Sequence, residues 1–165
     1  MQHAFAAAAL AALVLMAGTV PPARAQTPEQ MIEQLRPPPR TRSLRNLVVE
    51  PQARPSLSLQ IQFAFDSAEV VAESRQALSD LAQALRSEAL AASRFSIEGH
   101  TDAKGRADYN LALSQRRADA VRALLASQGV EVQRLVAQGK GASEPVDPQD
   151  PLAAINRRVR IVNLD

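Results

Sequence analysis

The chain from residue 57 onward alternates between segments with apolar residues at every second position and segments with apolar residues at helical spacing. The first segment predicts a strand with one buried face, because its apolar residues are separated by Ser, Gln and Ala: Leu57, Leu59, Ile61, Phe63 and Phe65. Residues 68–90 then predict a helix, because leucines stand at helical spacing in an alanine-rich background: Leu78, Leu81 and Leu85.

The same alternation continues to the end of the chain. Residues 94–98 predict a second strand, residues 108–128 a second long helix, and residues 135–138 and 156–163 two further strands. Gly129 is well placed to end the second helix, because glycine readily adopts the left-handed conformation that closes many helices. The order βαβαββ predicts an α/β (α+β) two-layer sandwich with helices on one face of a mixed sheet.

The N-terminal part of the chain lacks this pattern and divides into two segments. The run from Ala4 to Val20 is almost wholly apolar and precedes Ala23-Arg24-Ala25, the small-x-small pattern of a signal peptidase site. We therefore expect residues 1–25 to be a signal peptide, with an uncleaved membrane anchor as the alternative. Prolines recur in residues 26–56 and predict an extended, semi-rigid linker before a folded domain at 57–165.

Composition excludes several kinds of chemistry. The chain has no cysteine, which excludes disulfides, thiol catalysis, cysteine metal ligands and a lipid-modified N-terminal cysteine. It has 2 histidines, and His3 lies in the expected signal peptide, so we expect no metal site and no cofactor. A formal net charge of +2 and an aromatic content of 3% favour neither the basic field nor the stacking surface of a nucleic-acid-binding protein.

Polar side chains gather where the second predicted strand meets the second long helix. Asp102 lies in the loop after the strand, and Arg117 lies on the inner arc of the helix. A guanidinium on a packed face requires an anionic partner, because burying an unpaired charge is very costly. Asn110, Ser114 and Arg117 make the N-terminal half of this arc polar, whereas the C-terminal half is apolar. The change of character indicates a site at the N-terminal end of the helix.

Each candidate residue also has a structural interpretation. Asp102 and Arg117 fit an ion pair that merely neutralises both charges. Asp66, which closes the first strand, is expected at the same edge of the sheet but also fits a cap for the first helix. Asn110 and Ser114 fit helix side chains that are satisfied locally.

Other polar residues near this edge have simpler interpretations. Arg157 and Arg158 precede the last strand and fit exposed edge charges, and His100 fits a loop residue without proton chemistry. Glu98 and Asp102 would be the acid pair of an enzyme that hydrolyses glycosidic bonds. We expect Glu98 within a strand and Asp102 in the following loop, with no sign that they flank one sugar, so an enzyme is the least favoured function.

Several short motifs occur in the order and spacing of a known family: Ile97-Glu98-Gly99-His100-Thr101-Asp102, Gly105, Tyr109-Asn110, Leu113-Ser114, Arg116-Arg117-Ala118, Val121 and Asn156-Arg157-Arg158-Val159. Through these motifs, residues 57–165 resemble the OmpA-like C-terminal domain. This domain is the peptidoglycan-binding module shared by outer-membrane porins, the peptidoglycan-associated lipoprotein and the flagellar stator protein. The resemblance implies the OmpA-like fold and a non-catalytic function.

The resemblance also implies that the domain grips the diaminopimelate residue of the cell-wall stem peptide. Asp102 would take the ammonium group of the ligand and Arg117 its carboxylate, and Asp66 and Asn110 match supporting positions. The expected pocket wall consists of Phe65, Thr101 and Leu113. A carboxylate and a guanidinium that are held apart bind both groups of such a zwitterion, with arginine engaging the carboxylate through two parallel bonds.

Two functions in the cell envelope follow from these observations. The favoured function is a non-catalytic periplasmic protein that binds peptidoglycan, associated with the cell wall or the outer membrane. The alternative is an envelope scaffold in which the proline-rich segment 26–56 recruits a protein partner and wall binding is secondary.

Overall fold

The computed structural model describes residues 26–38 and 53–165, so the expected signal peptide at residues 1–25 lies outside the described residues. Its centre is a four-stranded sheet with the strand order β1-β4-β2-β3, in which β2 and β3 are parallel and both neighbours of β4 are antiparallel to it. The strands are β1 (Ser56–Leu59), β2 (Phe95–His100), β3 (Leu135–Gly141) and β4 (Val159–Asn163). The predicted mixed sheet is therefore confirmed.

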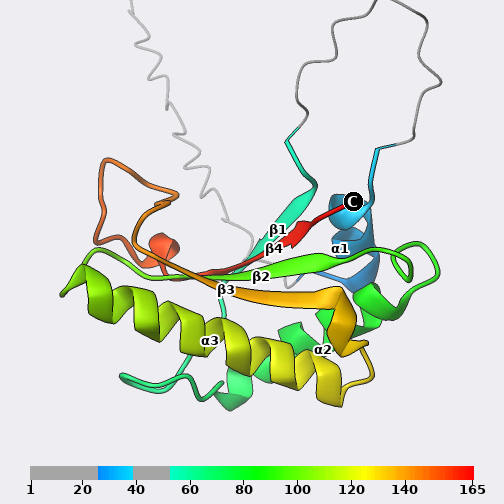
Figure 1. The fold of residues 1–165 in the computed structure, drawn as a ribbon, viewed down its shortest axis with the longest axis horizontal. Helices are drawn as coiled ribbons and strands as arrows, with labels where there is room; N and C mark the ends of the chain where they lie inside the picture. Colours follow the sequence, from blue (N-terminus) through cyan, green and yellow to red (C-terminus); the bar gives the residue numbers. More distant parts are fainter. Residues whose placement is uncertain (1–25, 39–52) are drawn as a thin grey trace, which may run out of the picture.

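Two long helices, α2 (Ala72–Arg86) and α3 (Ala107–Ser127), lie together below the sheet in Figure 1. Their apolar sides and one face of the sheet enclose a continuous core, which includes the fully buried Leu81, Phe95, Ile97, Val121 and Ile161. This arrangement confirms the predicted two-layer α/β sandwich. Within the described ranges, none of the helices combines the length and apolar character needed to cross a membrane.

Two glycines let α3 lie directly against the sheet. A Cβ atom at Gly99 of β2 would lie 2.2 Å from the Ser114 carbonyl oxygen, and one at Gly139 of β3 would lie 2.6 Å from the Gln115 nitrogen. The Ser114 hydroxyl donates to Leu111 O at 2.8 Å and accepts the Gly141 amide at 2.8 Å, which joins the helix to β3. Ser114 is therefore a polar contact of the interface, and the glycines fix the N-terminal half of α3 over the strand ends.

The assignment of residues 26–56 to an extended linker is wrong for one part of the segment. Residues Pro28–Leu35 form the helix α1, which begins with a capping box between Thr27 and Gln30. Met31 and Leu35 are buried in the core, and the Asn163 side chain donates to Leu35 O at 2.9 Å. Pro28 occupies the first turn, where its missing N–H costs nothing, so this proline starts a helix and does not mark a linker.

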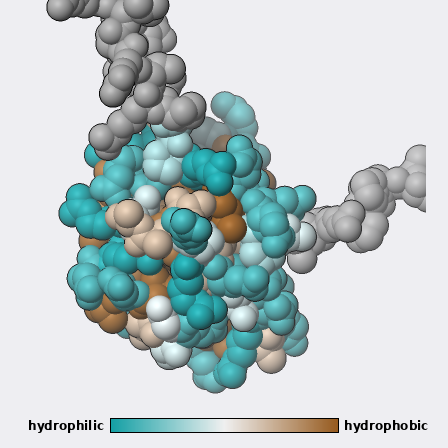
Figure 2. All heavy atoms as spheres, turned by 90° about the vertical axis from the view of Figure 1, so that its right-hand side faces the viewer, coloured by the Kyte–Doolittle hydropathy of each residue, from teal (hydrophilic) through white to brown (hydrophobic). Residues whose placement is uncertain are grey.

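The first predicted strand is shorter than the alternation suggested. β1 ends at Leu59, and beyond it Phe63 forms an isolated bridge with Val70 while Phe65 is fully exposed. Ile61 is still buried after the chain leaves the sheet, so the alternation continued beyond the hydrogen-bonded strand. Figure 2 shows the right-hand end of the domain of Figure 1, where hydrophobic residues form small groups between hydrophilic ones.

Candidate functional site

A cavity of about 510 Å³ lies where β2 ends and α3 begins. Figure 1 shows the end of β2 and the beginning of α3 at the left of the sheet. Of the residues that the sequence placed at a ligand site, all except Ser114 line this one cavity: Phe65, Asp66, Thr101, Asp102, Asn110, Leu113 and Arg117. The loop after β1, the loop after β2 and the first turns of α3 supply them. Segments far apart in the sequence are thus brought together as the sequence predicted.

Asp102 and Arg117 share the cavity without forming an ion pair. Asp102 Oδ2 accepts from Nη1 of Arg157 at 2.7 Å, and Oδ1 accepts the Lys104 backbone amide at 3.2 Å. Over the described ranges 26–38 and 53–165, no ion pair joins Asp102 to Arg117. The expectation that Asp102 and Arg117 neutralise each other is therefore wrong for this structure, and Asp102 is held by a different cation.

The Arg117 side chain is half-buried and only partly satisfied. Its Nε donates to Ser67 O at 3.0 Å, and its guanidinium carbon lies 4.8 Å from the centre of the Phe63 ring. Burial lowers the pKa of this guanidinium from its usual value, and the nearby charges of Asp66 and Asp102 oppose the shift. Among the described residues its two terminal nitrogens have no hydrogen-bond acceptor. These nitrogens leave the guanidinium able to bind an anion from the cavity.

Asp66 lies on the far wall of the cavity and does not cap a helix. Its φ of 52° is in the left-handed region, which aspartate tolerates better than most residues. Its carboxylate accepts a hydrogen bond from the Tyr109 hydroxyl, and this bond raises the pKa of the tyrosine. The residue that precedes α2 as its N-cap is Val71, without a side-chain cap. The capping interpretation of Asp66 is therefore wrong.

Asn110 and Thr101 fix the loop that carries Asp102. The buried Asn110 amide donates to Asp102 O at 3.3 Å and to Lys104 O at 3.0 Å, and the Thr101 amide donates to Gly141 O at 2.9 Å. Asn110 is thus satisfied by backbone carbonyls, as its structural interpretation expected, yet those carbonyls belong to the site. Leu113 is buried at the cavity wall, whereas Phe65 is fully exposed and contributes to the rim.

A comparison with known protein families decides which family the chain belongs to: residues 62–158 match the model of the OmpA family. The chain belongs to the OmpA family. The resemblance drawn from the motifs is confirmed, and the proteins of this family are non-catalytic peptidoglycan-binding domains. The hydrolase alternative, with Glu98 and Asp102 as its acid pair, is therefore set aside.

Individual relatives share this domain over part of their length. The chain is 36% identical over 102 residues to a peptidoglycan-associated lipoprotein of Haemophilus influenzae, covering 62% of this chain and 65% of the relative. It is 38% identical over 101 residues to outer membrane protein A of Bordetella avium, covering 60% of this chain and 51% of the relative. The chain thus spans between about half and two thirds of the length of these relatives.

A solved structure confirms the OmpA-like fold. The crystal structure of the peptidoglycan-associated lipoprotein from Burkholderia pseudomallei aligns with a TM-score of 0.54 and 36% sequence identity. The alignment covers 64% of this chain and 88% of that chain. The four-stranded sheet and the two long helices described above therefore form an OmpA-like domain.

Six residues that line the cavity of this OmpA-like domain were not predicted as site residues, and three of them have large side chains at the site: Phe63, Tyr109 and Arg157. Tyr109 and Arg157 belong to the motifs Tyr109-Asn110 and Asn156-Arg157-Arg158, so the motifs held a signal for both. The fully buried Asn156 accepts the Val146 amide at 2.8 Å and donates to Asp150 O at 2.9 Å, which fixes the segment that precedes β4. This segment places Arg157 beside Asp102, so the prediction of a mere edge charge is wrong.

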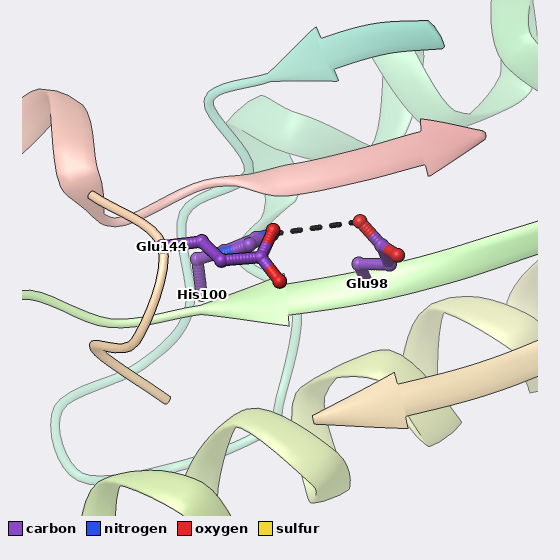
Figure 3. A group of neighbouring side chains, drawn as sticks. All are labelled: Glu98, His100 and Glu144. Carbon is purple, nitrogen blue, oxygen red and sulfur yellow. Dashed lines mark ion pairs between the residues drawn. The ribbon is translucent and has the colours of Figure 1, made fainter. Parts of the chain in front are cut away.

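A second polar cluster lies on the sheet face opposite α3. Glu98, His100 and Glu144 point toward one another in Figure 3, with ligand atoms within 4.8 Å of each other. Lys140 Nζ lies 3.1 Å from Glu144 and 3.8 Å from Glu98, and Arg160 lies 3.7 Å from both carboxylates. The two carboxylates are therefore already paired with cations, which opposes the binding of a metal ion in their midst.

His100 is buried at the end of β2 and not in the loop where the sequence placed it. Burial, followed by the charge of Arg158, lowers the pKa of His100 from 6.5 to about 4. The imidazole is consequently neutral at pH 7. Its neighbours in Figure 3 belong to a sheet face that does not line the cavity of Asp102 and Arg117.

Proposed function

We propose that this OmpA-family domain binds peptidoglycan by gripping the diaminopimelate residue of the stem peptide between Asp102 and Arg117. The observation that carries the proposal is that a carboxylate and a half-buried guanidinium line one cavity of about 510 Å³ without pairing with each other. Two opposite charges that share a cavity and are held apart are complementary to a zwitterion.

The free end of the diaminopimelate side chain carries an ammonium and a carboxylate on one carbon. The carboxylate accepts two parallel hydrogen bonds from the terminal nitrogens of Arg117, whose Nε is already fixed by Ser67 O at 3.0 Å. The ammonium donates to Asp102, whose two oxygens accept more bonds than Arg157 and Lys104 provide. Asp66 adds a second negative charge to the cavity, and Asn110 holds the Asp102 loop against α3.

A sacculus pull-down tests the proposal. We expect Asp102→Ala and Arg117→Ala each to abolish capture by diaminopimelate-type sacculi, and free diaminopimelate to compete with the unchanged protein. Matched controls are Asp119→Ala and Arg75→Ala, which remove exposed charges of the same kind outside the cavity. Sacculi with lysine in place of diaminopimelate lack the side-chain carboxylate and should not be captured. Equal capture by both clamp variants and by the controls would refute the proposal.

The cellular location is part of the same proposal. The relatives are named as an outer membrane protein and as peptidoglycan-associated lipoproteins, which supports the periplasmic side of the envelope. We infer that residues 1–25 direct export and that the folded domain extends over residues 57–165 together with α1. The packing of Met31 and Leu35 in the core leaves residues 28–35 unavailable as a flexible arm, so it does not favour the scaffold alternative.

A further inference from the structure

A second cavity, of about 380 Å³, adjoins the proposed diaminopimelate cavity. The two cavities share three lining residues: Phe63, Arg117 and Arg157. They therefore meet along these three residues, two of which are arginines. The remaining wall of the second cavity comes from the segment after β1 and from Ala154 before β4.

The two cavities differ in charge. Asp66 and Asp102 line the first cavity and are absent from the second, whose charged lining residues are Arg117 and Arg157. Amide side chains and apolar groups complete the second cavity, with Gln60 and Gln62 on the exposed side. A molecule that spans both cavities thus meets carboxylates at one end and only cationic or neutral groups at the other.

Both guanidiniums retain donors for a further anion. Arg117 uses Nε on Ser67 O, and Arg157 uses Nη1 on Asp102, whereas a guanidinium has five N–H groups. The other nitrogens of these two side chains make no hydrogen bond to the residues that the structure describes. The two positive charges also repel each other across the shared wall, and an anion bound between them relieves that repulsion.

We propose that the second cavity binds a second carboxylate of the same stem peptide, next to the clamped zwitterion. The inference rests on the proposed function, because diaminopimelate in the first cavity holds the rest of the peptide near the second. Two groups of the peptide have this chemistry: the C-terminal carboxylate beyond diaminopimelate and the free carboxylate of the glutamate that precedes it. The domain then distinguishes a free carboxylate from an amidated one at this place in the peptide, in addition to recognising the diaminopimelate residue.

Isothermal titration of the unchanged protein with three synthetic stem tetrapeptides tests this inference. One peptide has both carboxylates free, one has its C-terminus amidated, and one has the glutamate carboxylate amidated. Because a charge-assisted hydrogen bond is replaced by a neutral one, we expect one of the amides to bind about tenfold more weakly. The amide that loses affinity identifies the carboxylate in the second cavity. Equal affinity for all three peptides would overturn the inference and leave the proposed function standing.

A variant that introduces a negative charge provides an independent test. Gln62→Glu places a negative charge in the second cavity only, and we expect it to weaken the free-acid peptide more than the sensitive amide, which reduces the tenfold preference. Gln149→Glu is the matched control, because this exposed glutamine lies outside both cavities. An unchanged preference in Gln62→Glu would contradict the inference. If neither free diaminopimelate nor any peptide binds the unchanged protein, the proposed function fails and the second subsite fails with it.

Discussion

Asp102 in the loop after β2 is paired with Arg157 in the segment before β4, with 2.7 Å between Oδ2 and Nη1. The pair joins two loops at the cavity and holds the carboxylate at a fixed place, and among the residues that the structure describes Arg117 has no carboxylate partner. The acid of the proposed clamp is therefore oriented by a second arginine. Arg157 occupies the boundary between the two cavities, so its charge bears on both.

Replacing Arg157 with alanine should change stability little. The arginine side chain of the pair is 50% exposed, and Asp102, which is 14% exposed, keeps the Lys104 amide as a partner, so the pair contributes about 1 kcal/mol, the upper limit for exposed ion pairs. We expect Arg157→Ala to lower the free energy of unfolding in urea by about 1 kcal/mol. A loss of several kcal/mol would show that Arg157 supports the fold of the loops and not only the orientation of Asp102.

Asn110 should affect both stability and binding. Its buried amide donates to two loop carbonyls, and removing it leaves them without that partner. We expect Asn110→Ala to cost about 1–3 kcal/mol of unfolding free energy and to weaken capture by sacculi, because the Asp102 loop loses its attachment to α3. Leu111→Ala, at a half-exposed position of the same helix, is the control. A variant as stable and as tightly bound as this control would rule out the anchoring role.

The helix α1 should contribute to stability although the sequence predicted a linker there. Leu35 is fully buried, and truncating a buried leucine typically costs about 2–5 kcal/mol. We expect Leu35→Ala to lower the urea midpoint strongly and Glu33→Ala, whose side chain is 79% exposed, to leave it nearly unchanged. Similar midpoints for the two variants would mean that α1 does not stabilise the domain in solution.

Two glycines offer a contrast between close packing and backbone conformation. A Cβ atom at Gly99 would meet the Ser114 carbonyl at 2.2 Å, whereas at Gly105, with a φ of 92°, nothing lies within 4 Å. Gly99→Ala forces α3 away from the sheet, so we expect a loss near the upper end of the range of about 1–3 kcal/mol in urea unfolding. Gly105→Ala makes no steric clash but places alanine at an unfavourable φ, so it should lower the unfolding free energy by about 1 kcal/mol. Equal losses would show that α3 adjusts freely over β2.

The sequence predicted the order of the elements, because hydrophobic periodicity is read within short stretches. It also predicted that four site residues gather at one edge, because they belong to short motifs: Asp66, Asp102, Asn110 and Arg117. The partner of Asp102 was not predictable, because Arg157 is distant in the sequence and is placed beside Asp102 by a loop that the buried Asn156 anchors. The helix α1 was missed for a different reason. It is short and lies in a proline-rich segment, although the capping box of Thr27 and Gln30 and the proline in its first turn are sequence signals for the start of a helix.

His100 should make stability depend on pH in a defined range. Burial lowers its pKa in the folded state to about 4, below the value of 6.5 expected for the unfolded chain. Between these two values the unfolded state binds more protons, so acid favours unfolding. The unfolding free energy is therefore not reduced by His100 above pH 6.5, and it decreases as the pH falls from 6.5 toward 4. The expected loss is on the order of 3 kcal/mol.

Comparison with a variant separates His100 from the other titrating groups. The cations and acids that face it are retained in His100→Gln: Lys140, Arg158, Arg160, Glu98 and Glu144. Glu144, whose pKa is lowered mainly by its hydrogen bond to Lys140, also loses stabilising charge in acid and contributes to both curves. The unfolding free energy of the unchanged protein minus that of the variant should therefore decrease as the pH falls from 7 to 4, because only the unchanged protein has an imidazole that takes up a proton on unfolding. Parallel curves would mean that the folded protein holds His100 with an ordinary pKa, in contact with water.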